Sequence, residues 1–238
     1  MSLDIAQGVL LRLKFEPDLR LHYLVQTEVA QEVINKGVVA GRTQQKWETR
    51  VWQRVLRVEA DGSAHLVTVS EPQVEPGKVQ VPGVTLQRQV VYSFMDTRGH
   101  LLEIAGASPG STYSFPDHPV AAGQAWEGKS ELVVPGMSEP VVGSNHYVLV
   151  GSEDLNDIPC VKIQMKASEI TFEMPLPDGR NKARVLLESE GWLYFAPLEG
   201  MLVRMEMKTH SIPKIQDVIF DTVTLMVQQL DGVERPGA

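Results

Sequence analysis

The chain has 238 residues, of which 43% are hydrophobic and 22% are charged, and its formal net charge is −8 at pH 7. This composition is ordinary for a globular protein, and the length suits a single all-β domain over residues 1–238. The negative charge argues against nucleic acid as a partner, and no apolar run approaches the ~18 residues of a membrane span.

The first residues do not have the pattern of a secretory signal peptide. Met1–Gly8 lacks a basic region, and the apolar stretch Val9–Leu11 is broken by Arg12. We therefore favour a cytoplasmic location, with the cell envelope as the alternative if an export signal has been trimmed.

Two alternating segments open the chain. Leu11–Phe15 predicts a short strand, and Leu19–Val33 alternates apolar and polar residues throughout. At about 3.3 Å per residue, the second segment would be a strand of roughly 50 Å. Strands of this length twist, so a sheet built from them curls around its apolar face.

The next segments predict a long hairpin. Lys46–Glu59 reads as a second long strand, whose apolar positions change parity and so indicate a bulge near Val51–Trp52. Asp61-Gly62 is a hairpin turn signal, because both residues tolerate positive φ, and Leu66–Val69 returns as the partner strand.

The rest of the chain continues this pattern. Glu71–Gly83 and Gly106–Pro119 read as loops, and Asn156-Asp157 and Asp178-Gly179 as hairpin turns. Further strands are predicted at Val90–Phe94, Leu101–Ile104, Lys129–Val134, Asn145–Val150, Cys160–Ala167, Ile170–Met174, Ala183–Leu187, Trp192–Phe195, Met201–Lys208 and Val218–Leu230.

Helical periodicity is nearly absent, with one weak possibility at Ala30–Lys36. Without a helix layer, an apolar sheet face must be covered by the sheet itself. We therefore predict an all-β fold: a strongly curved antiparallel sheet that forms an open half β-barrel with little helix.

The sequence offers no recognisable catalytic motif. It lacks a Gly-x-Ser-x-Gly elbow and a glycine-rich phosphate loop, and its six histidines are scattered singly. Cys160, the single cysteine, lies in an alternating strand segment and is interpreted as a small structural residue. We expect no enzyme activity, no metal and no cofactor.

Methionines provide the functional hypothesis. Met201, Val203, Met205 and Met207 share one parity of a predicted strand, opposite Leu202. Methionine side chains are flexible and adapt to varied apolar partners. We expect a binding protein that holds an apolar small molecule or lipid on the concave face. The candidate ligand-binding residues are Leu21, Tyr23, Val25, Met201, Val203, Met205 and Met207.

Two alternatives remain open. The same methionines could fill a solid core in a structural or protein-interaction module, whose partners would dock on an edge strand or the two loops. A carbohydrate-binding module would instead need at least two exposed, coplanar tryptophans among Trp47, Trp52, Trp126 and Trp192.

The order of several short motifs resembles the LolA/LolB/LppX-like group of lipoprotein-localisation half-barrels, especially its uncharacterised bacterial members. The resemblance spans about residues 9–230, and it implies a curved antiparallel sheet whose concave face holds acyl chains, without catalytic residues. The motifs are Leu13-Lys14-Phe15-Glu16-Pro17, Met95-Asp96-Thr97-Arg98-Gly99-His100-Leu101, Phe115-Pro116-Asp117-His118-Pro119-Val120, Gly123-Gln124-Ala125-Trp126, Tyr147–Gly151, Ile158-Pro159-Cys160-Val161-Lys162-Ile163 and Glu190-Gly191-Trp192 with Gly200-Met201.

Overall fold

A computed structural model describes residues 3, 5–74, 87–106, 113–132, 134, 137, 139–176 and 181–237. These residues contain strands and no helix, so none of them forms a helix able to cross a membrane. The strands are β1 (Arg20–Asn35), β2 (Val38–Val58), β3 (Ala64–Gln73), β4 (Gln89–Met95), β5 (Leu101–Ala105), β6 (Ala125–Leu132), β7 (Val141–Leu155), β8 (Ile158–Ala167), β9 (Ile170–Pro175), β10 (Lys182–Ala196), β11 (Met201–Ile215) and β12 (Val218–Glu234).

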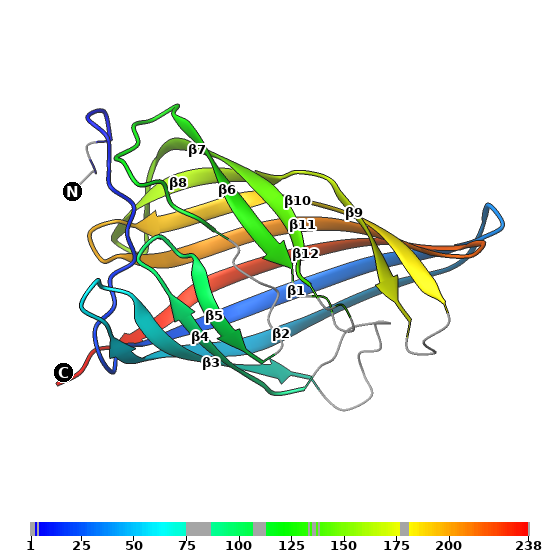
Figure 1. The fold of residues 1–238 in the computed structure, drawn as a ribbon, viewed down its shortest axis with the longest axis horizontal. Coiled ribbons are helices and arrows are strands. Elements are labelled where there is room, and N and C mark those ends of the chain that lie inside the picture. Colours follow the sequence, from blue (N-terminus) through cyan, green and yellow to red (C-terminus); the bar gives the residue numbers. More distant parts are fainter. Residues whose placement is uncertain are drawn as a thin grey trace.

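All twelve strands belong to one antiparallel sheet that curves around its apolar face (Figure 1). Its order is β5-β4-β3-β2-β1-β12-β11-β10-β8-β7-β6, and β9 pairs with β10 off this path. The first and last strands of the chain pair at the middle of the sheet, whereas β5 and β6 form its two free edges. The predicted open, curved all-β sheet is confirmed.

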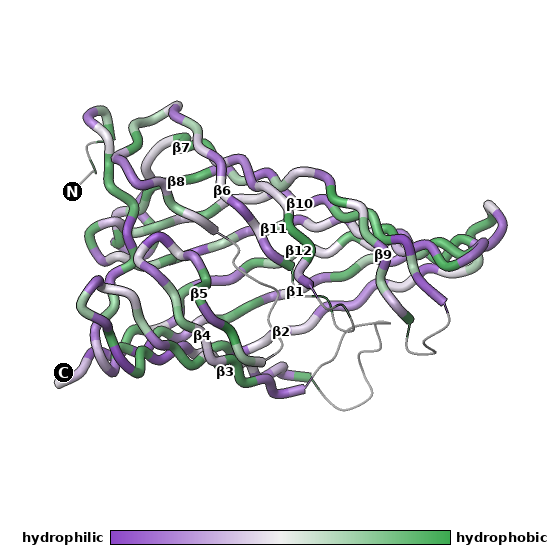
Figure 2. The backbone as a smooth tube through the Cα atoms, viewed as in Figure 1, coloured by the Kyte–Doolittle hydropathy of each residue, from purple (hydrophilic) through white to green (hydrophobic). Residues whose placement is uncertain are grey.

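Long hairpins give the molecule its elongated shape (Figure 1). The β1–β2 turn places Lys36 and Gly37 at φ values of 48° and 79°, which glycine adopts readily. The predicted Asn156-Asp157 turn also has two positive φ values and joins β7 to β8. Hydropathy alternates along the strands in Figure 2, as a sheet with one apolar and one polar face requires.

Several local predictions are corrected by the structure. Ala30–Lys36 is not helical, since β1 extends to Asn35, and the predicted strands Ala183–Leu187 and Trp192–Phe195 are both parts of β10. In β2 the register shifts between Val55 and Arg57, after the predicted position of the bulge. Bulges follow from pairing with the neighbouring strand, and the sequence of one strand does not specify that pairing.

The predicted loops are only partly described. Glu71–Gln73 belongs to β3, so the prediction of a loop at these three residues is wrong. Residues 75–83 and 107–112 of the two predicted loops, and the Asp178-Gly179 turn, lie outside the described residues. Residues 113–119 are described and contain no strand, as predicted.

The N-terminal segment closes one end of the curved sheet instead of adding the predicted strand at Leu11–Phe15 (Figure 1). Its backbone bonds go to separate loops: the Leu13 N–H donates to Thr97 O (2.7 Å) and the Lys14 N–H to Gly200 O (3.0 Å). A strand would need a continuous partner, so this segment instead lies across the end, with Leu11 and Leu13 buried beneath it.

The core lies at this closed end. One cluster contains Leu11 and Leu13 together with aromatic residues such as Phe115 and Phe195, whose ring centroids are 4.6 Å apart. A second cluster gathers Leu19 with residues of the central strands. The N-terminal segment is therefore part of the core, and the sheet depends on it for cover at this end.

We expect Leu11→Ala to lower the free energy of unfolding by about 2–5 kcal/mol, because Leu11 is fully buried. The matched control is Leu10→Ala, since Leu10 is 47% exposed and the change should stay within about 0.5 kcal/mol. Urea denaturation followed by tryptophan fluorescence measures both. Equal losses for the two variants would show that the segment does not seal the core.

Candidate functional site

The predicted ligand-binding residues are all buried or half-buried, but they do not form one row. Leu21 and Tyr23 of β1 join Met201 and Val203 of β11 in one core cluster. Met205 belongs to the other cluster, and Met207 packs against it. Val25 is buried on the same face of β1 and belongs to neither cluster.

A bulge in β11 explains this division. Arg204 pairs with Tyr194 of β10, but Leu202 pairs with Phe195, which leaves Val203 as an extra residue. A bulge changes which side chains share a face. Leu202, which simple alternation places on the opposite face, is therefore buried in the same cluster as Met205.

At the closed end the side chains themselves fill the interior. The space bordered by Leu21, Tyr23 and Met201 measures about 20 Å³, which is room for roughly one water molecule. The Tyr23 hydroxyl donates a hydrogen bond to Leu202 O at 3.1 Å. Burial, with a smaller effect of Tyr113, raises the pKa of Tyr23 above its ordinary value, so the phenol stays a donor.

A row of apolar residues crosses the concave face just beyond this filled end. The direct cross-strand pairs run without interruption from β6 to β2, and we name the part that contains Met165, Gly191, Met207 and Met226 the methionine row. The full sequence of pairs is Trp126–Tyr147–Met165–Gly191–Met207–Met226–Thr27–Trp47.

Gly191 makes this row possible. A Cβ at Gly191 would lie 2.7 Å from Met207 Sδ and 2.0 Å from Glu206 O, both too close for any side chain. The missing side chain lets Met207 lie across β10. Met165 is buried, but Met207 and Met226 are only half-buried, so part of each side chain stays accessible on the concave face.

Beyond the methionine row the part of the concave face formed by β11 and β12 becomes polar, whereas Val29 of β1 and Leu187 of β10 are apolar residues of the same rows. The next row contains Ser189, Thr209 and Thr224, and the Ser189 and Thr209 hydroxyls lie 3.0 Å apart. In the following row Gln31 Nε2 donates to Thr222 Oγ1 at 3.0 Å. The row therefore marks a boundary between an apolar core and a lining of hydroxyl and amide groups.

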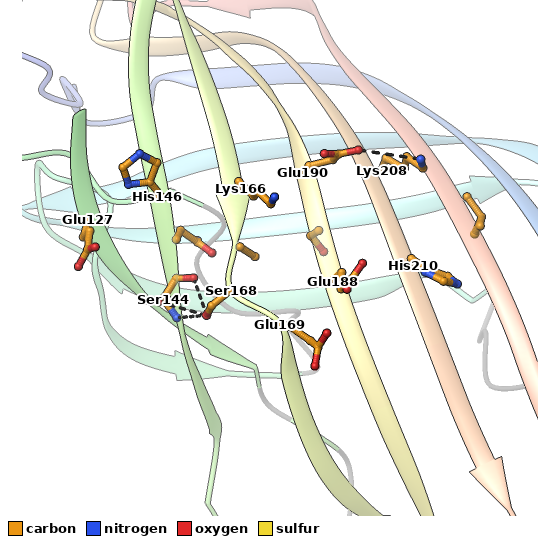
Figure 3. A pocket seen from close by; sticks show the side chains of 14 residues that line it. Glu127, Ser144, His146, Lys166, Ser168, Glu169, Glu188, Glu190, Lys208 and His210 are labelled. Carbon is orange, nitrogen blue, oxygen red and sulfur yellow. Dashed lines mark hydrogen bonds and ion pairs between the residues drawn. The ribbon is translucent and has the colours of Figure 1, made fainter. Parts of the chain in front are cut away.

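The outer face of the same strands carries a charged groove of about 700 Å³ (Figure 3). Opposite charges alternate between neighbouring strands, and Lys208 Nζ lies 3.9 Å from Glu190 Oε1. One row of paired positions contains Glu127, His146, Lys166, Glu190 and Lys208. This arrangement is typical of a solvated sheet surface, and exposed pairs of this kind stabilise little.

A third hollow, of about 690 Å³, lies between the two free edges of the sheet. Arg98, His100, Ser114 and Trp126 are among the residues that line it. Sequence analysis did not group these residues, because they come from the β4–β5 turn, the segment before β6, and β6 itself.

The tryptophans do not form a carbohydrate-binding platform. Trp47 and Trp126 are buried, and Trp52 and Trp192 are only half-exposed. Trp126 instead stacks on Tyr147, with ring centroids 5.3 Å apart. Among the described residues there is also no group of three or more His, Cys, Asp or Glu side chains that could hold a metal ion.

The sequence matches no protein-family model and no curated protein. Among solved structures, it is similar to a candidate exported protein with a YmcC-like fold from Bacteroides fragilis. That alignment has 10% identity, a TM-score of 0.38, and covers 96% of this chain and 100% of the other. Ail, the attachment invasion locus protein of Yersinia pestis, aligns with 8% identity and a TM-score of 0.21, covering 90% of this chain and 99% of Ail. At these scores neither likeness supports an inference about function.

We expect Gly191→Ala to destabilise the protein by about 1–3 kcal/mol, because the new methyl group must displace Met207 and the β11 backbone. Gly151→Ala is the matched control, since no atom lies within 4 Å of a Cβ at that strand position. Thermal unfolding compares the two. An unchanged melting temperature in Gly191→Ala would contradict the close approach.

We expect Cys160 to be unreactive in the folded protein. Burial raises the pKa of its thiol to about 11, so at pH 8 the reactive thiolate is scarce, and the side chain is fully buried. Ellman's reagent at pH 8 should give no fast reaction with native protein and one thiol per chain after denaturation in urea. Fast reaction of the native protein would refute the structural interpretation of Cys160.

Proposed function

We propose that this chain is a non-enzymatic binding protein that holds an apolar, lipid-like ligand on the concave face of its curved sheet. The observation that carries the proposal is the methionine row, where Met207 and Met226 remain half-buried at the edge of a filled core. Half-buried methionines on a concave surface suit a flexible apolar partner, since methionine adapts its shape to what it contacts.

The driving force would be removal of apolar surface from water. Each buried methylene contributes about 0.8 kcal/mol, so an acyl chain along the row needs no specific polar contact. The seven ligand-binding residues predicted from the sequence then lie at different distances from the methionine row. Met207 belongs to the methionine row, and Met205 and Val25 lie in the adjacent row, where both pair with Gln228. Leu21, Tyr23, Met201 and Val203 support the row from the filled end.

The polar rows beyond the methionine row favour an amphipathic ligand over a pure hydrocarbon. Ser189, Thr209, Thr222 and Thr224 offer hydroxyl groups that can donate to or accept from a polar headgroup. A lipid could place its acyl chain on the methionine row and its headgroup among these hydroxyls. The chain would then make apolar contacts while the headgroup makes hydrogen bonds. The resemblance to the LolA/LolB/LppX-like group points to the same class of ligand.

A structural or interaction module is the second candidate. It is supported by the space of about 20 Å³ at the closed end, where packing leaves no room for a ligand. In that case the free edges β5 and β6 would be the surfaces on which a partner strand could pair.

Binding of cis-parinaric acid, a fluorescent long-chain fatty acid, tests the proposal. We expect Met226→Gln to weaken binding about tenfold, which corresponds to about 1.4 kcal/mol of lost apolar contact. Leu225→Gln is the matched control, because Leu225 is the adjacent residue of β12, lies on the outer face and is 44% exposed.

Native mass spectrometry of the purified protein should also detect a co-purified lipid. Saturable binding that weakens in Met226→Gln and not in Leu225→Gln supports a ligand site at the methionine row. Absence of parinaric acid binding to the folded wild-type protein, or equal binding by both variants, would overturn the lipid-binding proposal. The structural or interaction module would then be the remaining candidate.

A further inference from the structure

A chain of three hydrogen-bonding side chains ends at the hollow between the two sheet edges, which His100 and Ser114 line. Asp96 Oδ2 lies 3.0 Å from His100 Nδ1, and His100 Nε2 lies 2.5 Å from Ser114 Oγ. Carboxylate, imidazole and hydroxyl thus follow one another in the order that activates a serine nucleophile. No other part of the site described above uses these groups.

The β4–β5 turn fixes the positions of Asp96 and His100. Asp96 Oδ1 accepts hydrogen bonds from the backbone N–H groups of Arg98 (2.8 Å) and His100 (2.9 Å). Gly99 completes the turn at a φ of 85°, and a Cβ there would lie 2.8 Å from the Tyr113 ring. The turn therefore presents His100 at a defined position beside the segment that carries Ser114.

The third member is held from two sides. The Phe115 N–H donates to Arg98 O at 2.8 Å, and Trp126 Nε1 donates to Ser114 O at 2.8 Å. Gly128 of β6 packs directly against Ser114, since a Cβ at Gly128 would lie 2.7 Å from Ser114 Cβ. Ser114 is only 5% exposed, but together with His100 it lines the hollow of about 690 Å³.

The charge state of Asp96 sets the hydrogen-bond direction. Burial acts to raise the pKa of Asp96, but the backbone donors of His100 and Arg98 and the His100 imidazole outweigh burial, and the net pKa is lowered. An ionised Asp96 only accepts, so His100 Nδ1 carries the proton and Nε2 is free to accept the Ser114 hydroxyl.

We propose that Ser114 is an activated nucleophile for hydrolysis of small carboxylic esters, with His100 as general base and Asp96 as the residue that orients it. This inference does not depend on ligand binding at the concave face, and it replaces the non-enzymatic part of the proposed function. It also departs from the sequence-based expectation that the chain is not an enzyme.

The reaction is balanced as follows. Ser114 Oγ forms a bond to the ester carbonyl carbon while its proton passes to His100 Nε2. The carbon–alkoxy bond then breaks, and the leaving alcohol takes that proton, which leaves an acyl-Ser114 ester. Water attacks this ester, gives one proton to His100, and releases the carboxylic acid as Ser114 recovers its proton.

The lining of the hollow indicates the substrate class. Phe115 and Trp126 line it with aromatic rings, and its charges are mixed, because Arg98 and Lys129 line it together with Asp117, Glu127 and Glu131. A lining of mixed charge favours neither an anionic nor a cationic substrate. An ester of a short apolar acid fits this combination.

The experiment treats the full chain with a fluorophosphonate probe, which forms a stable adduct with activated serines, and locates the adduct by peptide mass spectrometry. We expect labelling at Ser114 and measurable hydrolysis of p-nitrophenyl acetate. Ser114→Ala should abolish both. His100→Gln should slow labelling at least about 100-fold, the usual contribution of a general base.

Two further variants separate activation from a structural role. Asp96→Asn keeps Oδ1 as the acceptor of the turn but replaces Oδ2 with a donor, so His100 Nε2 becomes protonated and cannot accept from Ser114. Labelling should fall while the melting temperature stays close to wild type. His118→Gln is the matched control, because His118 also pairs with an aspartate on this hollow (Asp117, 2.8 Å), and labelling should not change.

The outcomes decide the proposal. Ser114-specific labelling that is lost in Ser114→Ala, His100→Gln and Asp96→Asn but kept in His118→Gln supports it. Folded wild-type protein that is not labelled at Ser114, or labelling that is unaffected in His100→Gln and Asp96→Asn, would show that the three side chains only tie the turn to β6.

Discussion

The structure depends on one constraint: an antiparallel sheet with an apolar face and, over the described residues, no helix to cover it. Apolar surface left in water is unfavourable, so the sheet has to curl and use its own strands as cover. Pairing of β1 with β12 brings the two ends of the chain to the middle of the sheet. The positions of the methionine row and of the hollow at the sheet edges both follow from how far the sheet covers its own apolar face.

The cover is complete at one end only. There the N-terminal segment lies across the sheet, and Leu11 and Leu13 fill the space together with aromatic residues from other strands. At the opposite end the long hairpins continue past the core, and their concave face changes from methionine to serine, threonine and glutamine. The methionine row is the boundary between these regions, which is why its residues are neither fully packed nor fully exposed.

The sheet does not close into a barrel, and this has a second consequence at its edge strands β5 and β6. Because β5 and β6 do not pair, the segment before β6 can lie between them and bond to the β4–β5 turn. This contact brings Ser114 to His100 and Asp96, although no sequence motif links the three residues. A closed sheet would have replaced these side-chain contacts with a ladder of backbone bonds.

The sequence by itself determined that the chain is a sheet of long strands with one apolar face, because alternation of side chains is a local property of extended backbone. It also located turns such as Asn156-Asp157, where residue type and positive φ are directly linked. Only the tertiary structure decided that Leu11–Phe15 closes an end, that the β11 bulge divides Met201 from Met205, and that Asp96, His100 and Ser114 meet. These features depend on a bulge that forms when strands pair and on contacts between distant segments, and the alternation within one strand specifies neither.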